Sequence, residues 1–299
     1  MNLKRAIGGP ILSFIFLVSI VYMIFVVQTV MKDYLPNQSM FLGSISEPSQ
    51  NIASDETPKP EVTAVSAISV ESDLKGTNKI IFDKNVDAKL PIASLTKLMT
   101  AIIVLDNYNL SDTITVDKIA DSQDAMKQDI KLGDNMPVKS FLEIMLVGSS
   151  NKSAYALAEL IGEQKFVGLM NKKAKEFGLE NTFFVDPTGL NSGNVSTAKD
   201  LSKLAEYILK NYPKIAEITK NKEFFVPNFG YVLNTDQLLG EIPEVVCSKT
   251  GFTTAAKGCL LLVMNNQKNN DYLINVVLGA DDRFLEMKKI INWSSVMCQ

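Results

Sequence analysis

The 299-residue chain contains no histidine, and this absence restricts its chemistry more than any other feature of its composition. A Ser/His/Asp triad, a histidine-ligated zinc site and an H-E-x-x-H helix all need an imidazole. A hydrolase built from this chain must therefore activate its nucleophile with another base. A lysine amine is the remaining option near neutral pH, because burial or a neighbouring cation can lower its pKa toward the working range.

Cysteine is also scarce, with only Cys247, Cys259 and Cys298 in the chain. Three is an odd number, and the spacing is not that of a metal site, so neither a disulfide framework, a metal nor a cofactor is indicated. Cys247 and Cys259 could face each other across a hairpin. The sequence leaves open whether they are bridged, because bridging depends on a Cα separation.

Charge of one sign does not dominate: 30 basic and 33 acidic residues give a net charge of -3, without a dense Lys/Arg run. This balance argues against nucleic acid as a partner. Hydrophobic residues make up 46% of the chain, which is enough for a sizeable core. No internal repeat is found, so one domain with two lobes is the simplest interpretation.

An uncharged apolar run covers residues 11–31 and is long enough to span a bilayer as a helix. Lys4 and Arg5 precede it, so residues 1–10 are expected in the cytoplasm and the rest of the chain outside the membrane. The alternative is a cleaved signal peptide, but the run exceeds a typical h-region and no A-x-A-like site ends it. Residues 32–62 are polar and contain prolines and serines, which is typical of a linker to a domain at 63–299.

The domain itself shows strand patterns at both ends and helical patterns between them. Ser94 to Leu105 is predicted to be a helix buried on several sides. We expect strands at 64–70, 79–82, 224–226, 230–233, 245–250, 259–264 and 272–278, and further helices at 138–147, 150–162, 165–177, 197–211 and 282–293. One sheet built from both ends of an α+β domain follows.

S-x-x-K pairs place a hydroxyl and an amine on one helix face, but four such pairs occur, starting at Ser72, Ser94, Ser149 and Ser196. Only Ser94 begins a helix buried enough to desolvate its lysine. Taken alone, Ser94 could equally be a helix cap, and a K-T-G run could be a turn.

Order and spacing give the pattern its meaning. Ser94 and Lys97 are followed by Ser149-Ser150-Asn151, and then by the single K-T-G run, Lys249-Thr250-Gly251. This arrangement resembles the signature of penicillin-binding proteins and serine β-lactamases. The flanks P-I-A-S-L-T-K-L-M-T-A, F-V-D-P-T-G-L and S-K-T-G-F-T resemble those of low-molecular-mass D-alanyl-D-alanine carboxypeptidases, peptidase family S11, over roughly residues 62–299.

The resemblance implies a β-lactamase/D,D-peptidase-like fold: an antiparallel sheet of about five strands, helices on both faces and an all-helical lobe. It also implies that Ser94 attacks the penultimate D-alanine carbonyl while neutral Lys97 accepts its proton, forming an acyl-enzyme. The backbone N–H groups of Ser94 and Phe252 would form the oxyanion hole.

The remaining motif residues receive roles by the same resemblance. Ser149 would relay a proton to the leaving amine, and Asn151 would hold the substrate amide and Lys97. Lys249 and Thr250 would bind the terminal carboxylate, and the charge of Lys249 would favour a neutral Lys97. Gly251 would let the substrate lie along the strand edge, because it has no side chain.

Two departures affect specificity: Lys152 stands where the family usually has an acidic residue, and Thr188 stands where histidine is frequent. A class A β-lactamase would need a deacylating glutamate three residues before Leu190-Asn191, and Pro187 is there instead. Slow release of bound penicillin, as in a β-lactam target, is therefore expected.

The resemblance thus favours a membrane-tethered, penicillin-sensitive D-Ala-D-Ala carboxypeptidase with its catalytic domain on the extracytoplasmic side. Its partners would be peptidoglycan stem peptides ending in D-Ala-D-Ala and β-lactam inhibitors. A D,D-endopeptidase that cuts peptidoglycan cross-links with the same residues remains an alternative. A catalytically inactive wall-binding module is less favoured, because all the chemical positions are intact.

Overall fold

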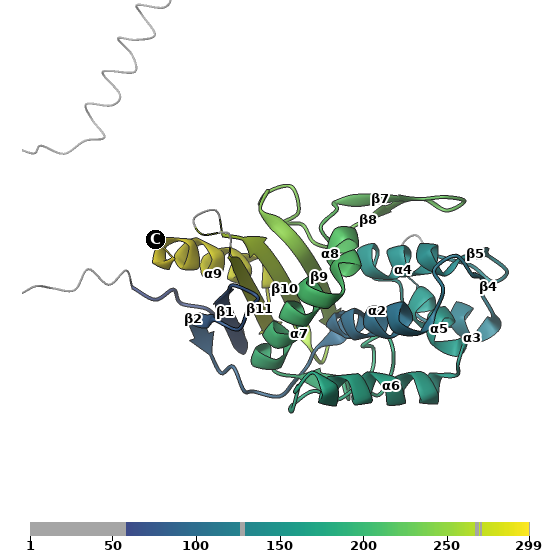
Figure 1. The fold of residues 1–299 in the computed structure, drawn as a ribbon, viewed down its shortest axis with the longest axis horizontal. Helices are drawn as coiled ribbons and strands as arrows, with labels where there is room; N and C mark the ends of the chain where they lie inside the picture. Colours follow the sequence, from purple (N-terminus) through teal and green to yellow (C-terminus); the bar gives the residue numbers. More distant parts are fainter. Residues whose placement is uncertain (1–57, 126–128, 267–268, 270, 299) are drawn as a thin grey trace, which may run out of the picture. The chain divides into compact units, whose positions relative to one another are not determined.

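A computed structural model describes residues 58–125, 129–266, 269 and 271–298, which fold as an α+β unit (Figure 1). Its centre is a five-stranded antiparallel sheet in the order β2-β1-β11-β10-β9. The strands are β1 (Ser66–Ser72), β2 (Asn78–Lys84), β9 (Val245–Thr253), β10 (Lys257–Asn265) and β11 (Tyr272–Ala280). The predicted sheet of about five strands from both ends of the domain is confirmed.

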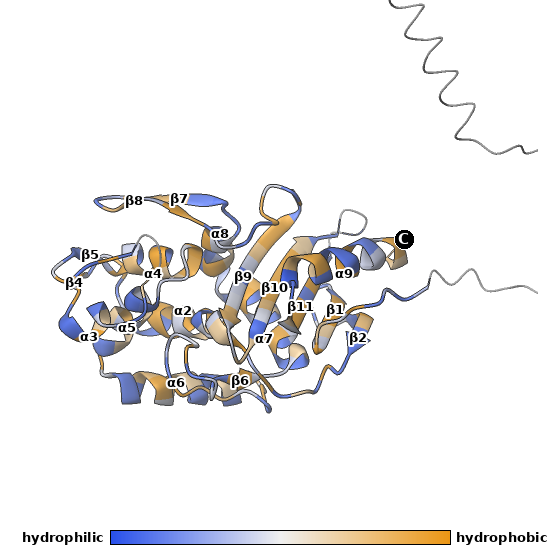
Figure 2. Cartoon of the chain, turned by 180° about the vertical axis from the view of Figure 1, so that it is seen from behind, coloured by the Kyte–Doolittle hydropathy of each residue, from blue (hydrophilic) through white to orange (hydrophobic). Residues whose placement is uncertain are grey.

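Strand β10 reads as an almost continuous apolar run because both of its faces are covered. Leu261 and Val263 belong to one hydrophobic core, and Leu260 and Leu262 to the other. Helix α9 (Arg283–Met297) packs against the second face, while α7 (Ala198–Asn211) and α8 (Pro213–Thr219) pack against the first. Figure 2 shows the apolar strands between these helical layers.

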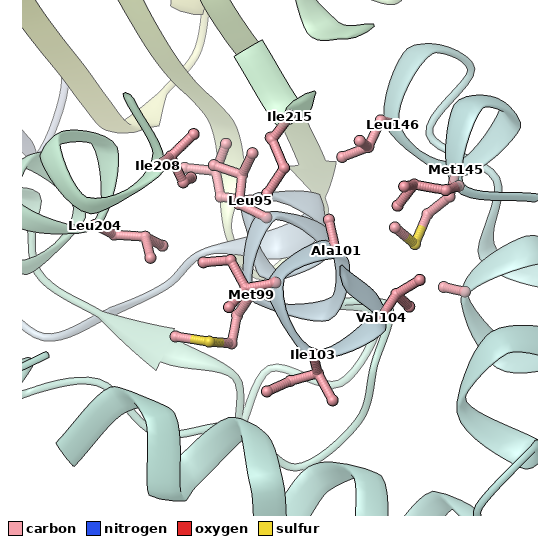
Figure 3. Close-up of a cluster of buried hydrophobic side chains, with 14 of the residues drawn as sticks. Leu95, Met99, Ala101, Ile103, Val104, Met145, Leu146, Leu204, Ile208 and Ile215 are labelled. Carbon is pink, nitrogen blue, oxygen red and sulfur yellow. The ribbon is translucent and has the colours of Figure 1, made fainter. Parts of the chain in front are cut away.

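Helix α2 (Thr96–Asn107) runs through the middle of the larger core and is buried from Thr96 to Val104. Figure 3 shows its apolar side chains pointing in several directions, toward residues of α4, α7 and α8. The sequence of α2 has no polar face, and burial of the helix on all sides explains this. Helices α4 (Val138–Val147), α5 (Asn151–Glu159) and α6 (Glu163–Glu176) complete this region.

The structure corrects several details of the prediction. The helical region is not all helical, because β4 (Thr113–Thr115) pairs with β5 (Asn135–Pro137) within it, and β3 (Leu90–Pro91) pairs with β6 (Val195–Ser196) beside it. The short α3 (Lys118–Asp121) and the helix α8 were not predicted.

Two predicted strands do not join the main sheet. They form a separate hairpin of β7 (Glu223–Val226) and β8 (Gly230–Leu233), which packs against α4 (Figure 1).

Cys247 and Cys259 lie on neighbouring strands but do not face each other. Cys247 is opposite Val263, and Cys259 is opposite Gly251. Both thiols are buried and free. Burial raises the pKa of each to about 11, which makes them poorly reactive at neutral pH.

The predicted transmembrane run at 11–31 and most of the predicted linker at 32–62 lie outside the described residues. Within 58–298, apart from the gaps given above, no helix combines the length and apolar character needed to cross a membrane.

Candidate active site

Ser94 lies in a short 3-10 turn, η1 (Ala93–Leu95), that leads directly into α2. Ala93 has a φ of 47°, an unusual backbone conformation for a residue with a side chain. Lys97 follows one turn later, and its Nζ is 2.9 Å from Ser94 Oγ. The sequence prediction that these two side chains lie together is confirmed.

Lys97 is completely buried, and three acceptors from three parts of the chain surround its amine. Besides Ser94 Oγ, Nζ donates to Asn151 Oδ1 at 2.7 Å and to the Thr188 carbonyl at 2.8 Å. Burial lowers the pKa of Lys97 to about 7, against the opposing attraction of Asp186 and Asp129. Burial therefore lowers the pKa of Lys97. The charge of Lys249, which the sequence predicted to favour neutral Lys97, is not the source of this shift.

The second motif lies between α4 and α5. Ser149 has a φ of 64°, and its Oγ accepts a 2.9 Å hydrogen bond from Lys249 Nζ. Ser150 caps α5 by accepting from Ser153 N and donates to Asp129. Asn151 begins α5, and its side-chain amide oxygen Oδ1 accepts a hydrogen bond from Lys97. The motif thus links the lysines of the two other motifs.

The third motif lies on β9, the edge strand of the sheet. Lys249 is buried, and its pKa is lowered by that burial and by repulsion from Lys97 and Arg283. A Cβ on Gly251 would lie 3.0 Å from both Ile92 O and Ser94 N. Gly251 is therefore needed for the close approach of β9 to the turn that carries Ser94, besides any role in admitting substrate.

The loop at 186–189 supports the site by contacting Lys97. The sequence predicted no such role for it, because its residues entered only through the resemblance of F-V-D-P-T-G-L to the family. Asp186 is buried, and its Oδ1 accepts from Thr188 N, Thr188 Oγ1 and Gly189 N at 2.6 to 2.7 Å. These bonds hold the Thr188 carbonyl, rather than its side chain, against Lys97. Thr188 can thus replace the more frequent histidine without losing this contact.

Lys152, the other departure from the family pattern, binds an acidic side chain outside the three motifs. Its Nζ forms a 2.6 Å ion pair with Asp121 at the end of α3. The change of charge is therefore compensated locally. Two other S-x-x-K lysines also lie elsewhere, since Lys199 pairs with Asp87 and Lys75 lies in the β1–β2 turn.

Three residues beside β9 were missed by sequence reasoning. Thr235 contacts Thr250 through their hydroxyls, and the buried Asp236 accepts from Ser248 Oγ. Arg283, at the start of α9, is near enough to lower the pKa of Lys249, and its Nε has no hydrogen-bond partner among the described residues. None of the three has a motif that could have identified it.

The site therefore combines three parts. The Ser94 hydroxyl is hydrogen-bonded to the Lys97 amine, the Ser-x-Asn turn lies beside them, and the edge strand β9 carries Lys249. Fold and site together define the penicillin-binding protein/β-lactamase class. The D-alanyl-D-alanine carboxypeptidase model of peptidase family S11 matches residues 52–282. The chain belongs to this family.

Similar proteins agree with this assignment. The chain is 34% identical to the D-alanyl-D-alanine carboxypeptidase DacF of Bacillus subtilis, over 77% of this chain and 62% of that protein. It is 35% identical to the D-alanyl-D-alanine endopeptidase of Escherichia coli, over 81% of this chain and 80% of that protein. The chain thus spans less than two thirds of the first relative.

Among solved structures, penicillin-binding protein D2 of Listeria monocytogenes in its cefotaxime-bound form has a TM-score of 0.72. The identity is 26%, over 79% of this chain and 99% of that chain. The α+β fold is therefore shared with a protein known in a β-lactam-bound form.

Gly189 gives a stability test of the loop that supports Lys97. It has a φ of 88°, and an added Cβ would lie 1.9 Å from Ala93 O. We expect Gly189→Ala to lower the free energy of unfolding by at least about 3 kcal/mol, because both the strained backbone and the clash disfavour it. Urea denaturation of the folded domain measures this loss.

Gly168→Ala is the matched control, because Gly168 lies within α6 and a Cβ there would meet nothing within 4 Å. This variant should be about 0.5 to 1 kcal/mol more stable than the wild type. Equal stability of the two variants would show that the 186–189 loop is not packed on Ala93 as described.

Proposed function

We propose that the protein is a penicillin-sensitive serine D-Ala-D-Ala carboxypeptidase that removes the terminal D-alanine from peptidoglycan stem pentapeptides. The observation that carries this proposal is the environment of the Lys97 amine. A neutral amine has two hydrogens, which Asn151 Oδ1 and the Thr188 carbonyl can accept. Its lone pair then faces Ser94 Oγ, ready to take the hydroxyl proton.

The first step forms an acyl-enzyme. Ser94 Oγ attacks the carbonyl carbon of the penultimate D-alanine while its proton moves to Lys97. The backbone N–H groups of Ser94 and Phe252 stabilise the oxyanion, and removing such a donor costs about 3 to 4 kcal/mol. This assignment is supported by the 3.0 Å approach of a Gly251 Cβ position to Ser94 N, which places the two backbones side by side.

Proton transfer to the leaving D-alanine amine passes through Ser149. Ser149 Oγ accepts from Lys249 Nζ, and Lys97 contacts Asn151 of the same turn and is near enough to lower the pKa of Lys249, which supports this route. The C–N bond breaks, D-alanine leaves, and water then attacks the ester with Lys97 again as the base.

The terminal carboxylate binds at the cationic edge of β9. Lys249 and Thr250 supply an ammonium and a hydroxyl, and Arg283 adds a second positive charge from α9. Arg283 Nε, which has no hydrogen-bond partner among the described residues, supports this role. A carboxylate placed here would offset the repulsion between the cations and favour the protonated form of Lys249.

The second candidate is a D,D-endopeptidase that uses the same residues on cross-linked stems. The match to the Escherichia coli endopeptidase covers 80% of that protein, which supports the endopeptidase as a second candidate. An inactive wall-binding module is disfavoured, because the contacts of Ser94, Lys97, Ser149 and Asn151 are those that the reaction needs.

The chain is anchored in the cell membrane by residues 11–31, with residues 1–10 in the cytoplasm, 32–62 as a linker and 63–299 as the extracytoplasmic catalytic domain. This part of the proposal is supported by the uncharged run and by Lys4 and Arg5 before it. It agrees with a peptidoglycan substrate, which lies outside the cytoplasm.

Covalent labelling tests the nucleophile. We expect fluorescent penicillin to label the protein at Ser94, with a long-lived adduct because Pro187 occupies the position of a deacylating glutamate. Ser94→Ala should abolish labelling, while the control Ser72→Ala should retain it, as Ser72 lies in another S-x-x-K pair. Gel fluorescence and peptide mass spectrometry give the result, and an unlabelled wild type would refute the proposal.

The pKa of Lys97 predicts the pH dependence of acylation. Only the neutral amine can accept the Ser94 proton, so the acylation rate should rise with pH and reach half of its plateau at about 7. Between pH 8 and pH 6 the rate should fall about tenfold, as the amine becomes protonated. Stopped-flow measurements with a chromogenic cephalosporin would test this, and a profile flat from pH 6 to 8 would exclude Lys97 as the base.

Product analysis separates the two candidate activities. The soluble domain, incubated with pentapeptide and with cross-linked dimer muropeptides, should release free D-alanine from the pentapeptide and leave most dimers uncut. Mass spectrometry measures both products, and the Ser94→Ala variant is the control. Faster conversion of dimers to monomers would favour the endopeptidase.

A further inference from the structure

The Thr250 hydroxyl, which the proposed function assigns to the substrate carboxylate, lies against a second hydroxyl. Thr250 is buried on β9, and its Oγ1 is hydrogen-bonded to Oγ1 of Thr235, which follows the β7–β8 hairpin. Within the part of the chain that the structure describes, neither hydroxyl has another hydrogen-bond partner. The two hydroxyls therefore form an isolated pair at the edge of the sheet.

Asn234 fixes the backbone around Thr235. Its side-chain Nδ2 donates to the carbonyls of Thr219 and Asn221 at 3.1 and 3.0 Å, and its Oδ1 accepts from Asp236 N at 2.9 Å. Both amide hydrogens of Asn234 are used in this way. The residues before and after Thr235 are therefore held next to the end of α8.

Asp236 fixes the same segment to β9. Ser248 and Thr250 are two residues apart on this strand, so their side chains point to the same face. The buried Asp236 accepts from Ser248 Oγ, and Thr235 meets Thr250 beside it. The Thr235 hydroxyl is thus held against Thr250 by contacts on both sides of it.

The number of hydrogens decides what this pair can do for an anion. A hydroxyl has one hydrogen to donate and two lone pairs that accept. If Thr250 donates to Thr235, it has no hydrogen left for a carboxylate, which only accepts. If Thr235 donates instead, the Thr250 hydrogen is free, and the bond that Thr250 accepts polarises its hydroxyl into a stronger donor.

The surrounding charge attracts an anion to this place. Lys249 directly precedes Thr250, and Arg283 is near enough to lower the pKa of Lys249, although Asp236 offsets part of the positive charge. A carboxylate bound beside Thr250 takes its hydrogen. Thr235 is then left as the donor within the pair.

We propose that Thr235 is a positioning residue for the substrate carboxylate: its hydroxyl donates to Thr250 Oγ1 and so directs the Thr250 hydrogen toward the carboxylate. This inference rests on the proposed function, which places the carboxylate at Lys249 and Thr250. The alternative is that the pair only ties residues 234–236 to β9. Such a tie would affect every substrate equally, whereas a positioning role depends on the carboxylate.

Two thioester substrates isolate the contribution of the carboxylate. Benzoyl-D-alanyl thioglycolate carries a carboxylate on its leaving group, and the matching thioglycolamide carries a neutral amide there. The measured quantity is the carboxylate preference, defined as kcat/KM for the thioglycolate divided by kcat/KM for the thioglycolamide. The wild type should show a preference of at least about tenfold, because hydrogen bonds to a charged group are lost with the amide.

Thr235→Val replaces the hydroxyl with a methyl group of similar size. This variant should lower kcat/KM for the thioglycolate about tenfold and leave the thioglycolamide within about twofold of the wild type. Thr235→Ser keeps the hydroxyl and should retain the preference. The matched control is Thr219→Val, because Thr219 Oγ1 contacts Cys247 Sγ and Ser248 N of β9, both at 3.4 Å, but not Thr250. Its carboxylate preference should equal that of the wild type.

A double-mutant cycle with Thr250→Val tests whether Thr235 acts through Thr250. Adding Thr235→Val to Thr250→Val should change the preference by less than about twofold, because the hydroxyl to be positioned is already gone. Circular dichroism checks that each variant is folded. If Thr235→Val does not fold, Thr235→Ala takes its place, since it also lacks the hydroxyl.

Several results would overturn the proposal. Equal losses with both substrates in Thr235→Val would indicate the structural tie, and an unchanged preference would show that the Thr235 hydroxyl has no part in recognition. Full additivity in the cycle would separate Thr235 from Thr250. A wild type that reacts with both thioesters without preference would also contradict the proposal, whereas a wild type that reacts with neither of them nor with penicillin would refute the proposed function itself.

Discussion

The candidate site depends on one buried amine. Lys97 leaves water completely, which costs an ammonium group several kcal/mol and so favours the neutral form. The surroundings compensate with three acceptors, each from a different segment: the η1 turn, the start of α5 and the 186–189 loop. The position of Lys97 therefore requires that all three segments, and the helix α2 between them, are packed correctly.

The second cluster of charge contains another buried lysine, Lys249, whose pKa is also lowered by burial. Lys249 and Arg283 repel each other, and the buried Asp236 partly balances them. Burial thus lowers the pKa of both lysines. They differ in their contacts, because Lys97 meets Ser94 Oγ and Asn151 Oδ1, whereas Lys249 meets Ser149 Oγ. The Ser149–Asn151 segment connects them, because Ser149 Oγ accepts from Lys249 and Asn151 Oδ1 accepts from Lys97.

Much of this arrangement could be predicted from residue types and order. The absence of histidine left lysine as the base, and the spacing of the three motifs identified Ser94 among four similar serines. The apolar run in β10 and the lack of a polar face in α2 predicted that both elements are buried. Asp236 and Arg283 could not be predicted, because a single carboxylate or guanidinium in a polar loop looks like ordinary surface charge until the fold buries it. The Gly251 requirement was also only partly visible, since the backbone that approaches it comes from residues 92–94.

The order of strands in the sheet has a consequence for how the protein is made. Strand β1 has β2, the next strand in the chain, on one side. On its other side it pairs with β11, as Ser66 with Leu278, and that partner exists only after almost the whole chain has been synthesised. Contacts of such long sequence separation form slowly, because a large loop must close before they gain stability. A nascent chain that has already exposed Ser94 therefore has no K-T-G strand beside it. The candidate site is therefore incomplete until β9 emerges. The β1–β2 pair can form early, but the side of β1 that later pairs with β11 stays unpaired until then.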